Sequence, residues 1–172
     1  MRPLNRYRFF VLLLAVIFLV ACKVNYSLSD KGGIPAEAKS VSVSMFQNNA
    51  SLSPPVLPQR FTEKLRDMLS SQTNLSLKTS SGDLHFEGFI SDYSVAPVAI
   101  QTGDKAALNR LTISVQVKYY NRFNKSKDFE QTFTRFNDFA ADKSLSSVEN
   151  QLMEEINRQL CEDIFNKAFN DW

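Results

Sequence analysis

Cysteine, histidine and glycine are scarce in this 172-residue sequence, which holds two cysteines, one histidine and five glycines. Two cysteines cannot build the multi-bridge disulfide framework of a small secreted protein. With so few thiols and imidazoles, a zinc site of the usual ligand type would have to rest on carboxylates alone. Glycine-rich phosphate-binding loops and zinc-protease motifs do not occur. These absences argue against an enzyme and predict no metal or organic cofactor.

A hydrolytic activity would have to depend on the one histidine, His85. It alternates with Leu84 and Phe86 in the stretch DLHFEGF, which places it on the outward side of a strand. The acidic pairs Glu154–Glu155 and Glu162–Asp163 are adjacent on a helix, so their carboxylates point about 100° apart and form no convergent dyad. An envelope hydrolase acting through His85 is the least favoured alternative.

A hydrophobic segment long enough to cross a membrane is also missing. The apolar run Phe9–Ala21 has 13 residues, whereas a spanning helix needs about 20. Arg2, Arg6 and Arg8 precede the run, and no acidic residue occurs before Asp30. A basic start, a short apolar middle and a small residue before a break are the parts of an export signal.

The run ends in the letters LVAC, residues 19–22, which resemble the lipobox of bacterial lipoproteins. In that family the cysteine thiol receives a diacylglyceryl group, and the chain is cut before the cysteine. The resemblance implies that residues 1–21 are removed and that lipid on Cys22 holds the protein to a membrane. Cys161 then has no intramolecular partner, and its place near a helical apolar stripe predicts a buried thiol.

Removal of the signal changes the charge balance. The whole chain has 20 basic and 18 acidic residues, a formal net charge of +2. Three basic residues leave with residues 1–21, so 17 remain against 18 and the balance becomes −1. A chain without a strong positive field is not expected to bind nucleic acid non-specifically.

The rest of the chain divides into a polar stretch and a folded part. Residues 22–38 predict a flexible tether, and residues 39–172 are long enough for a single domain. Alternation indicates strands and single apolar stripes indicate helices. The strands are expected near residues 40–45, 75–77, 84–90, 111–120 and 128–139, and the helices near 58–69 and 147–170. We expect an α+β two-layer sandwich, with two helices packed on one face of a mostly antiparallel four-stranded sheet.

Two stretches break the expected alternation. Residues 95–108 lose the period altogether. In the last strand Phe129 and Phe133 share a parity that Phe136 does not, which predicts a bulge or partial cover on the second face of the sheet.

Basic and aromatic residues concentrate around the strand of residues 111–120. The basic ones lie in the loop before that strand or the hairpin after it: Lys105, Arg110, Arg122, Lys125 and Lys127. Because lysine and arginine pair strongly with phosphates, we predict that they contact an anionic ligand or a partner. The hairpin holds more aromatic residues than one sheet face can bury. We therefore predict that Tyr120, Phe123 and Phe136 face a partner.

Several stretches together resemble one known family. They are the lipobox, VSVSMFQNNASLSPPVLPQRFTEKLRDMLSSQTNLSL, GDLHFEGFISDY, NRLTISVQVKYYN and the closing SVENQLMEEINRQLCEDIFNKAFNDW. In order and coverage, residues 26–172 resemble the LptE-type lipopolysaccharide-assembly lipoproteins, in a branch of Bacteroidetes type. The resemblance implies an outer-membrane lipoprotein that faces the periplasm and is not an enzyme.

The resemblance also implies partners. LptE-type proteins plug and help assemble a large β-barrel, LptD, and aid the transport of lipopolysaccharide to the outer leaflet. The predicted basic residues would then contact lipopolysaccharide or the barrel. The alternative is a self-assembling secretion-channel lipoprotein of CsgG type, which shares the lipobox and the opening strand–helix–strand order. That reading needs long amphipathic segments, for which only residues 95–108 and 111–139 could serve.

Overall fold

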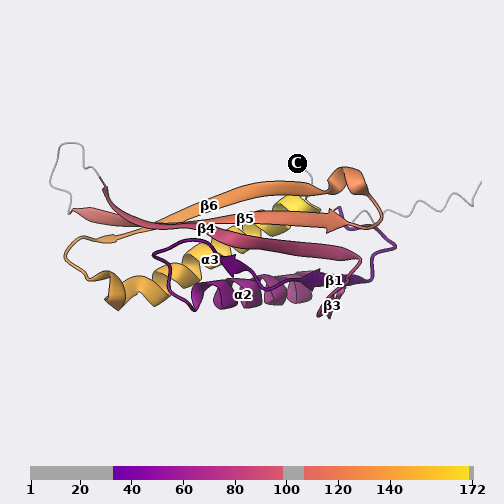
Figure 1. Cartoon of the computed structure of the whole chain (residues 1–172), viewed down its shortest axis with the longest axis horizontal. Coiled ribbons are helices and arrows are strands. Elements are labelled where there is room, and N and C mark those ends of the chain that lie inside the picture. The colour runs from indigo at the N-terminus through magenta and orange to yellow at the C-terminus, as the bar shows by residue number, and fades with distance from the viewer. Residues whose placement is uncertain (1–32, 99–106, 171–172) are drawn as a thin grey trace, which may run out of the picture. The chain divides into compact units, whose positions relative to one another are not determined.

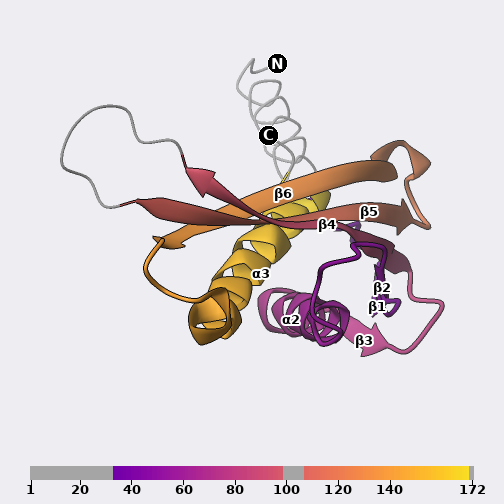
Figure 2. The same cartoon turned by 60° about the vertical axis from the view of Figure 1, so that its left-hand side comes forward.

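Two helices lie on one face of a six-stranded sheet (Figures 1 and 2). The computed structural model describes residues 33–98 and 107–170. The elements follow in the order β1 (Ser40–Val43), β2 (Gln47–Asn48), α2 (Leu57–Gln72), β3 (Ser76–Lys78), β4 (Leu84–Val98), β5 (Leu108–Asn121), the 3-10 helix η1 (Lys125–Lys127), β6 (Phe129–Ala140) and α3 (Leu145–Phe169). The expected signal, the lipidated Cys22 and Lys105 lie outside the described residues.

The sheet is mixed and has the strand order β3-β1-β4-β5-β6, with β2 also paired to β4. β4, β5 and β6 form a long antiparallel meander. β1 pairs in parallel with β3 and with β4, and β2 pairs in parallel with β4. The two-layer α+β expectation is confirmed, but the sheet has six strands and not four. β3 is the short strand expected near residues 75–77, whereas β2 has two residues and is too short for alternation to indicate.

β4 contains a bulge, and beyond Tyr93 its residues 95–98 are buried on neither face, so alternation is lost there. The register with β5 shifts between Ile90 and Asp92, so Ser91 is the extra residue. Before the bulge the even positions face the core, and after it Tyr93 does. β4 therefore continues to Val98, well past the predicted end of the strand. One inserted residue moves every later side chain to the other face.

The last strand contains no such bulge. β6 pairs with β5 in unbroken register from Phe129 to Ala140. Phe133 and Phe139 are buried, whereas Phe136 lies on the opposite face with 48% of its surface exposed. Of the two predicted explanations, the bulge is wrong. Phe136 departs from the parity because it lies on the second face of the sheet, where Arg110 partly covers its ring.

The core lies between the sheet and the apolar stripes of the two helices. Leu65 and Leu69 of α2 and Ile156 and Leu160 of α3 are fully buried. Each such side chain contributes roughly 1.5–3 kcal/mol relative to an exposed one. Cys161 is buried in the same core, and this burial raises the pKa of its thiol. A buried neutral thiol packs as a small apolar group, as the sequence predicted.

The start of the described chain packs on the end of α3. A Cβ added at Gly33 would lie 3.2 Å from the backbone oxygen of Phe169. Ile34 and Ala38 are partly buried against the core. The packed part of the chain thus includes residues that precede the predicted domain boundary at residue 39.

Candidate interaction surface

The long strands place every second side chain on the face opposite the helices, here called the open face. At its centre, Gln116 Nε2 donates to Glu130 Oε1 at 2.6 Å, and Lys118 Nζ lies 3.4 Å from Glu130 Oε2. The hydroxyls of Ser114 and Thr134 are 2.8 Å apart. The centre of the open face is therefore covered by polar groups that already bind one another across the strands.

One corner of the open face is formed by Tyr120 and His85. Their rings stack with centroids 6.1 Å apart, and the Tyr120 hydroxyl donates to Glu87 Oε1 at 3.2 Å. Partial burial, and after it the hydrogen bond to Glu87, raises the pKa of Tyr120. The ring nitrogen Nδ1 of His85 lies 2.8 Å from Ser42 Oγ. His85 is outward-facing, as predicted, and is held by neighbours on two strands.

The pairing of Ser42 with His85 does not form a usable nucleophile. Ser42 is fully buried, and its Oγ already accepts a hydrogen bond from the backbone N–H of Gly82 at 2.9 Å. An activated serine must reach a substrate carbonyl, which this burial prevents. The geometry gives no support to the hydrolase alternative.

The other corner of the open face is formed by Arg110, Phe136 and Asp138. Arg110 Nε donates to Asp138 Oδ1 at 2.7 Å and Nη2 donates to Asp138 Oδ2 at 2.9 Å. The guanidinium carbon lies 3.6 Å from the centroid of the Phe136 ring. The hydrogen bonds from Arg110 lower the pKa of the Asp138 carboxyl. Arg110 thus forms a bidentate ion pair with Asp138 and also stacks on the exposed ring of Phe136.

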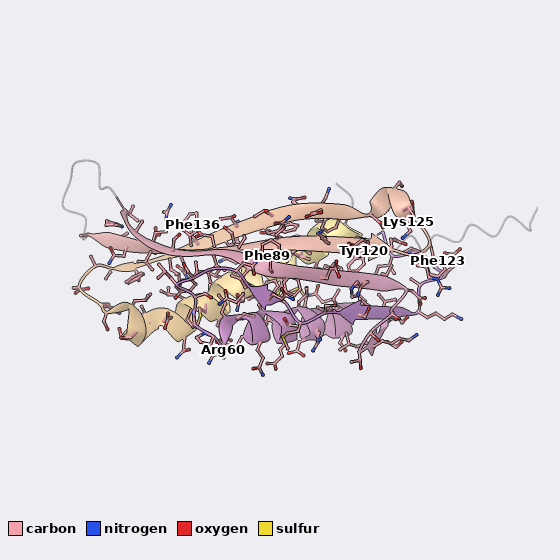
Figure 3. The ribbon with its side chains drawn as sticks, in the orientation of Figure 1. Arg60, Phe89, Tyr120, Phe123, Lys125 and Phe136 are labelled. Carbon is pink, nitrogen blue, oxygen red and sulfur yellow. The ribbon has the colours of Figure 1, made fainter. Side chains whose placement is uncertain are left out.

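The β5–β6 turn, residues 121–128, carries the remaining described basic residues of the predicted set. Arg122 and Lys125 have side chains 75% and 73% exposed. Each has one long ion-pair contact of 3.6 Å, Arg122 to Asp83 and Lys125 to Asp128. Phe123 between them is 45% exposed. The turn therefore presents Arg122, Lys125 and the Phe123 ring to solvent. Figure 3 shows Phe123 and Lys125 at this end of the sheet.

The predicted aromatic residues do not form one patch. In the strand register Tyr120 of β5 is opposite His85, and Phe136 of β6 is opposite Thr112. Thr112 precedes Tyr120 by eight residues along β5. At about 3.4 Å per residue, that spacing separates Tyr120 and Phe136 by roughly 27 Å. Phe123 lies beyond the strand, in the turn (Figure 3). The predicted basic residues are divided in the same way, with Arg110 toward one end of the sheet and Arg122, Lys125 and Lys127 at the other.

The sequence did not identify a shallow hollow of about 370 Å³ beside β4. Met45 and Phe89 line it together with Gln116, at the gap between β1 and β2. Met45 is 54% exposed, although alternation from Val41 and Val43 placed it inward. The chain leaves β1 at Val43 and turns Phe46 into the core instead. In the sequence Met45 and Phe46 are two adjacent apolar residues, and alternation alone does not say which of them is buried.

In residues 33–98 and 107–170, no group of three or more histidine, cysteine, aspartate or glutamate side chains could hold a metal ion. No helix in this part of the chain has the length and apolarity to cross a membrane. The features that remain are surfaces for contact: the open face and the two ends of the sheet.

Solved structures from several bacteria are similar to this one. The hypothetical protein CT253 from Chlamydia trachomatis is 11% identical, with TM-score 0.52 over 78% of this chain and 100% of that one. A putative neuraminyllactose-binding hemagglutinin homolog from Helicobacter pylori is 9% identical, with TM-score 0.50 over 79% and 86%. A minor lipoprotein from Acinetobacter baumannii is 14% identical, with TM-score 0.49 over 76% and 94%. At such identities the two likenesses with TM-scores of 0.52 and 0.50 show the fold alone.

The sequence itself gives the family. No curated protein matches the chain. The family model LptE, described as lipopolysaccharide-assembly, matches residues 38–168, which is most of the domain described above. The chain belongs to the LptE family of lipopolysaccharide-assembly proteins.

Proposed function

We propose that this protein is an outer-membrane lipoprotein, anchored through lipid on Cys22, that plugs and helps assemble an LptD-type β-barrel of the lipopolysaccharide translocon. It faces the periplasm and aids transport of lipopolysaccharide to the outer leaflet. The observation that carries this proposal is the family match over residues 38–168. The LVAC stretch at residues 19–22 supports the lipid anchor.

The arrangement of the surface supports a contact function rather than catalysis. The helices cover one face of the sheet, and the open face holds paired polar groups with aromatic rings at its corners. A surface of this composition resembles a wet, partly polar protein interface more than an apolar core. Tyr120 and Phe136 on this face, and Phe123 in the β5–β6 turn, are the proposed partner-facing aromatics. Arg110 at one end, Arg122, Lys125 and Lys127 at the other, and Lys105, which lies outside the described residues, are proposed contacts for anionic groups.

Isolation of the protein from its own outer membrane tests the proposal. A tagged full-length chain, extracted in mild detergent, is expected to bring down a stoichiometric β-barrel protein of LptD type. Mass spectrometry of the mature N-terminus should show a diacylglyceryl-modified cysteine at position 22. Recovery without any barrel would overturn the plug function. A ring-shaped homo-oligomer would favour the CsgG-type channel instead.

A further inference from the structure

We propose that the β5–β6 turn docks on the anionic phospholipid surface of the leaflet that holds the lipid anchor. Phe123 enters the headgroup region, and Arg122 and Lys125 contact phosphates on either side of it. The inference rests on the proposed acylation of Cys22, but it does not depend on any barrel partner. It assigns the opposite end of the sheet, where β4 and β5 are joined, to the side away from the anchor.

The first argument is where the described chain begins. Gly33 lies against the backbone of Phe169 at the end of α3. The Phe169 ring packs against Phe86 and Tyr119, with centroids 6.2 Å apart in each case. Tyr119 is two residues from Asn121, where the turn starts. The beginning of the described chain and the β5–β6 turn therefore share one end of the sheet (Figures 1 and 2).

The second argument is the reach of the chain between Cys22 and Gly33. Eleven residues span at most about 40 Å, whatever conformation they adopt. β5 has 14 residues, and from the level of Tyr119 to its other end at Leu108 it extends about 37 Å. The β4–β5 end could rest on the membrane only if those eleven residues were close to full extension. The turn end can reach the membrane with the linker in almost any conformation. The length of the linker therefore favours the turn end over the β4–β5 end as the part of the sheet that contacts lipid.

The third argument is the chemistry of the turn. Residues 121–128 (NRFNKSKD) contain three basic residues and one acidic residue, a formal charge of +2. Lys39 and Lys78, both exposed, lie near Asp83, beside the turn. Basic side chains near an anionic leaflet are attracted to it within a Debye length. An exposed phenylalanine among them supplies the apolar contact that an interfacial anchor uses.

The opposite end does not offer the same chemistry. Arg110, the basic residue described there, has its charge matched by Asp138 in a bidentate pair. Asp142 and Lys143, in the link from β6 to α3, balance each other in formal charge. An anionic surface would thus attract the turn end, which has a formal charge of +2, more strongly than the β4–β5 end.

The fourth argument is that the turn is held in one conformation by its own side chains. Asn121 Oδ1 accepts hydrogen bonds from the backbone N–H groups of Phe123 and Asn124, both at 3.0 Å. Asn124 Oδ1 in turn accepts from the backbone N–H of Ser126 at 3.1 Å. Asp128 Oδ1 accepts from the backbone N–H of Asn121 at 2.6 Å. A turn fixed in this way loses little conformational entropy when it binds, which favours docking.

A single spin label can measure how close each end lies to lipid. Cys161 is fully buried and Cys22 is the proposed lipid carrier, so an introduced surface cysteine can be labelled selectively. Ser126→Cys reports on the turn, and Ser146→Cys at the start of α3 reports on the other end. The acylated full-length mature protein is reconstituted into phosphatidylcholine vesicles with 30% phosphatidylglycerol. Relaxation by a nickel-chelating lipid then reports proximity.

We expect relaxation of the Ser126→Cys label to exceed that of the Ser146→Cys label at least fivefold. Arg122→Glu with Lys125→Glu should lower the relaxation of the Ser126→Cys label and so reduce this difference, because the anchor still holds the turn end nearer the lipid but the headgroup contact is lost. Arg60→Glu with Lys143→Glu, an equal change of net charge elsewhere, should leave the difference unchanged. Circular dichroism confirms that all variants fold. Vesicles of phosphatidylcholine alone should show a reduced difference.

Equal relaxation at both ends, or a difference that charge reversal in the turn leaves unchanged, would overturn the proposal. Contact seen only when lipopolysaccharide replaces phosphatidylglycerol would also overturn it and assign the turn to lipopolysaccharide. The proposed plug function fails on a different result, the absence of a co-isolated barrel. A mass spectrum without lipid on Cys22 would remove the shared premise of both.

Discussion

The guanidinium of Arg110 lies 3.6 Å from the centroid of the Phe136 ring while it makes two hydrogen bonds to Asp138. β5 and β6 bring the three side chains together because Arg110 pairs with Asp138 and Thr112 pairs with Phe136 in the same register. A basic residue and an aromatic residue that the sequence suggested for separate roles are thus one local structure. A charge reversal at Arg110 therefore also breaks the ion pair with Asp138, and the experiment needs a control for that loss.

Charge reversal at Lys105 and Arg110 is expected to weaken lipopolysaccharide binding, because it replaces two proposed phosphate contacts with carboxylates. Binding is measured by retention of purified lipopolysaccharide on the immobilised protein. Asp138→Asn is the matched control, since it breaks the same ion pair and leaves the cation in place. Unchanged retention in the charge-reversed variant would remove both residues from the contact surface.

Loss of the Arg110–Asp138 pair is expected to cost little stability. The two side chains are 37% and 28% exposed, and pairs of this kind contribute about 0.2–1 kcal/mol. The stack on Phe136 adds roughly 0.5–1 kcal/mol. Arg110→Gln should therefore lower the free energy of unfolding in urea by about 1 kcal/mol. A loss several times larger would show that the pair supports more of the sheet than its exposure indicates.

Tyr93→Phe is expected to destabilise the protein through the contact between β4 and α3. The Tyr93 hydroxyl donates to Glu149 Oε1 at 2.5 Å, and Tyr93 is only 5% exposed. Burial, and after it the hydrogen bond to Glu149, raises the pKa of Tyr93. Hydrogen bonds to a charged acceptor contribute about 1.5–3 kcal/mol, so the urea midpoint should fall accordingly. Tyr120→Phe, at the exposed corner of the open face, serves as the control and should change stability much less.

Gly88→Ala is expected to be strongly destabilising because the position has no room for a methyl group. An added Cβ would lie 2.1 Å from the backbone oxygen of Gln116 on β5 and 2.7 Å from Cε1 of Phe46. Overpacking of this kind costs typically 1–3 kcal/mol, and more where backbone must shift. Thermal unfolding measures the effect. Gly33→Ala, where the nearest atom would be at 3.2 Å, is the comparison and should cost less.

Acid should weaken α3 through Glu155. The hydrogen bond from Arg158, and after it that from Gln159, lowers the pKa of Glu155 to about 2, against a usual value of 4.5. A carboxyl with a lowered folded-state pKa stabilises the protein above its unfolded pKa, and this contribution is lost as the pH falls from 4.5 to 2. Urea midpoints measured across that range should fall less steeply for Glu155→Gln than for the wild type. Parallel curves would contradict this assignment.

Most of the fold followed from the sequence because its elements have strong periods. Val148, Leu152, Ile156, Leu160 and Ile164 recur at every fourth position, which predicts one apolar stripe. The last four are buried, and Val148 is partly buried against the core. The β5 alternation from Leu111 to Tyr119 predicted a half-buried strand, and those odd positions face the core. Such patterns are read correctly because one face of each element must leave water.

The sequence predicted which residues belong to the candidate surface but not which side chains they contact. Arg110, Arg122 and Lys125 were identified as basic residues near one strand, but their partners were not. Asp138 is 28 residues from Arg110 in sequence and Asp83 is 39 residues from Arg122, and a local pattern contains no information on such pairs. The β4 bulge at Ser91 was missed for a related reason, since a single inserted residue looks like the end of a strand.

The sequence by itself determined the element types, the buried stripes, the proposed lipid site and the scarcity of catalytic groups, because these depend on neighbours along the chain. Only the tertiary structure decided that Phe136 faces away from the helices, that Arg110 is paired, and that the β5–β6 turn lies beside the beginning of the described chain. These facts depend on strand register and on the packing of α3, which join residues far apart in sequence. The physical reason is that hydrophobic periodicity fixes which face is buried, whereas register fixes which side chains meet.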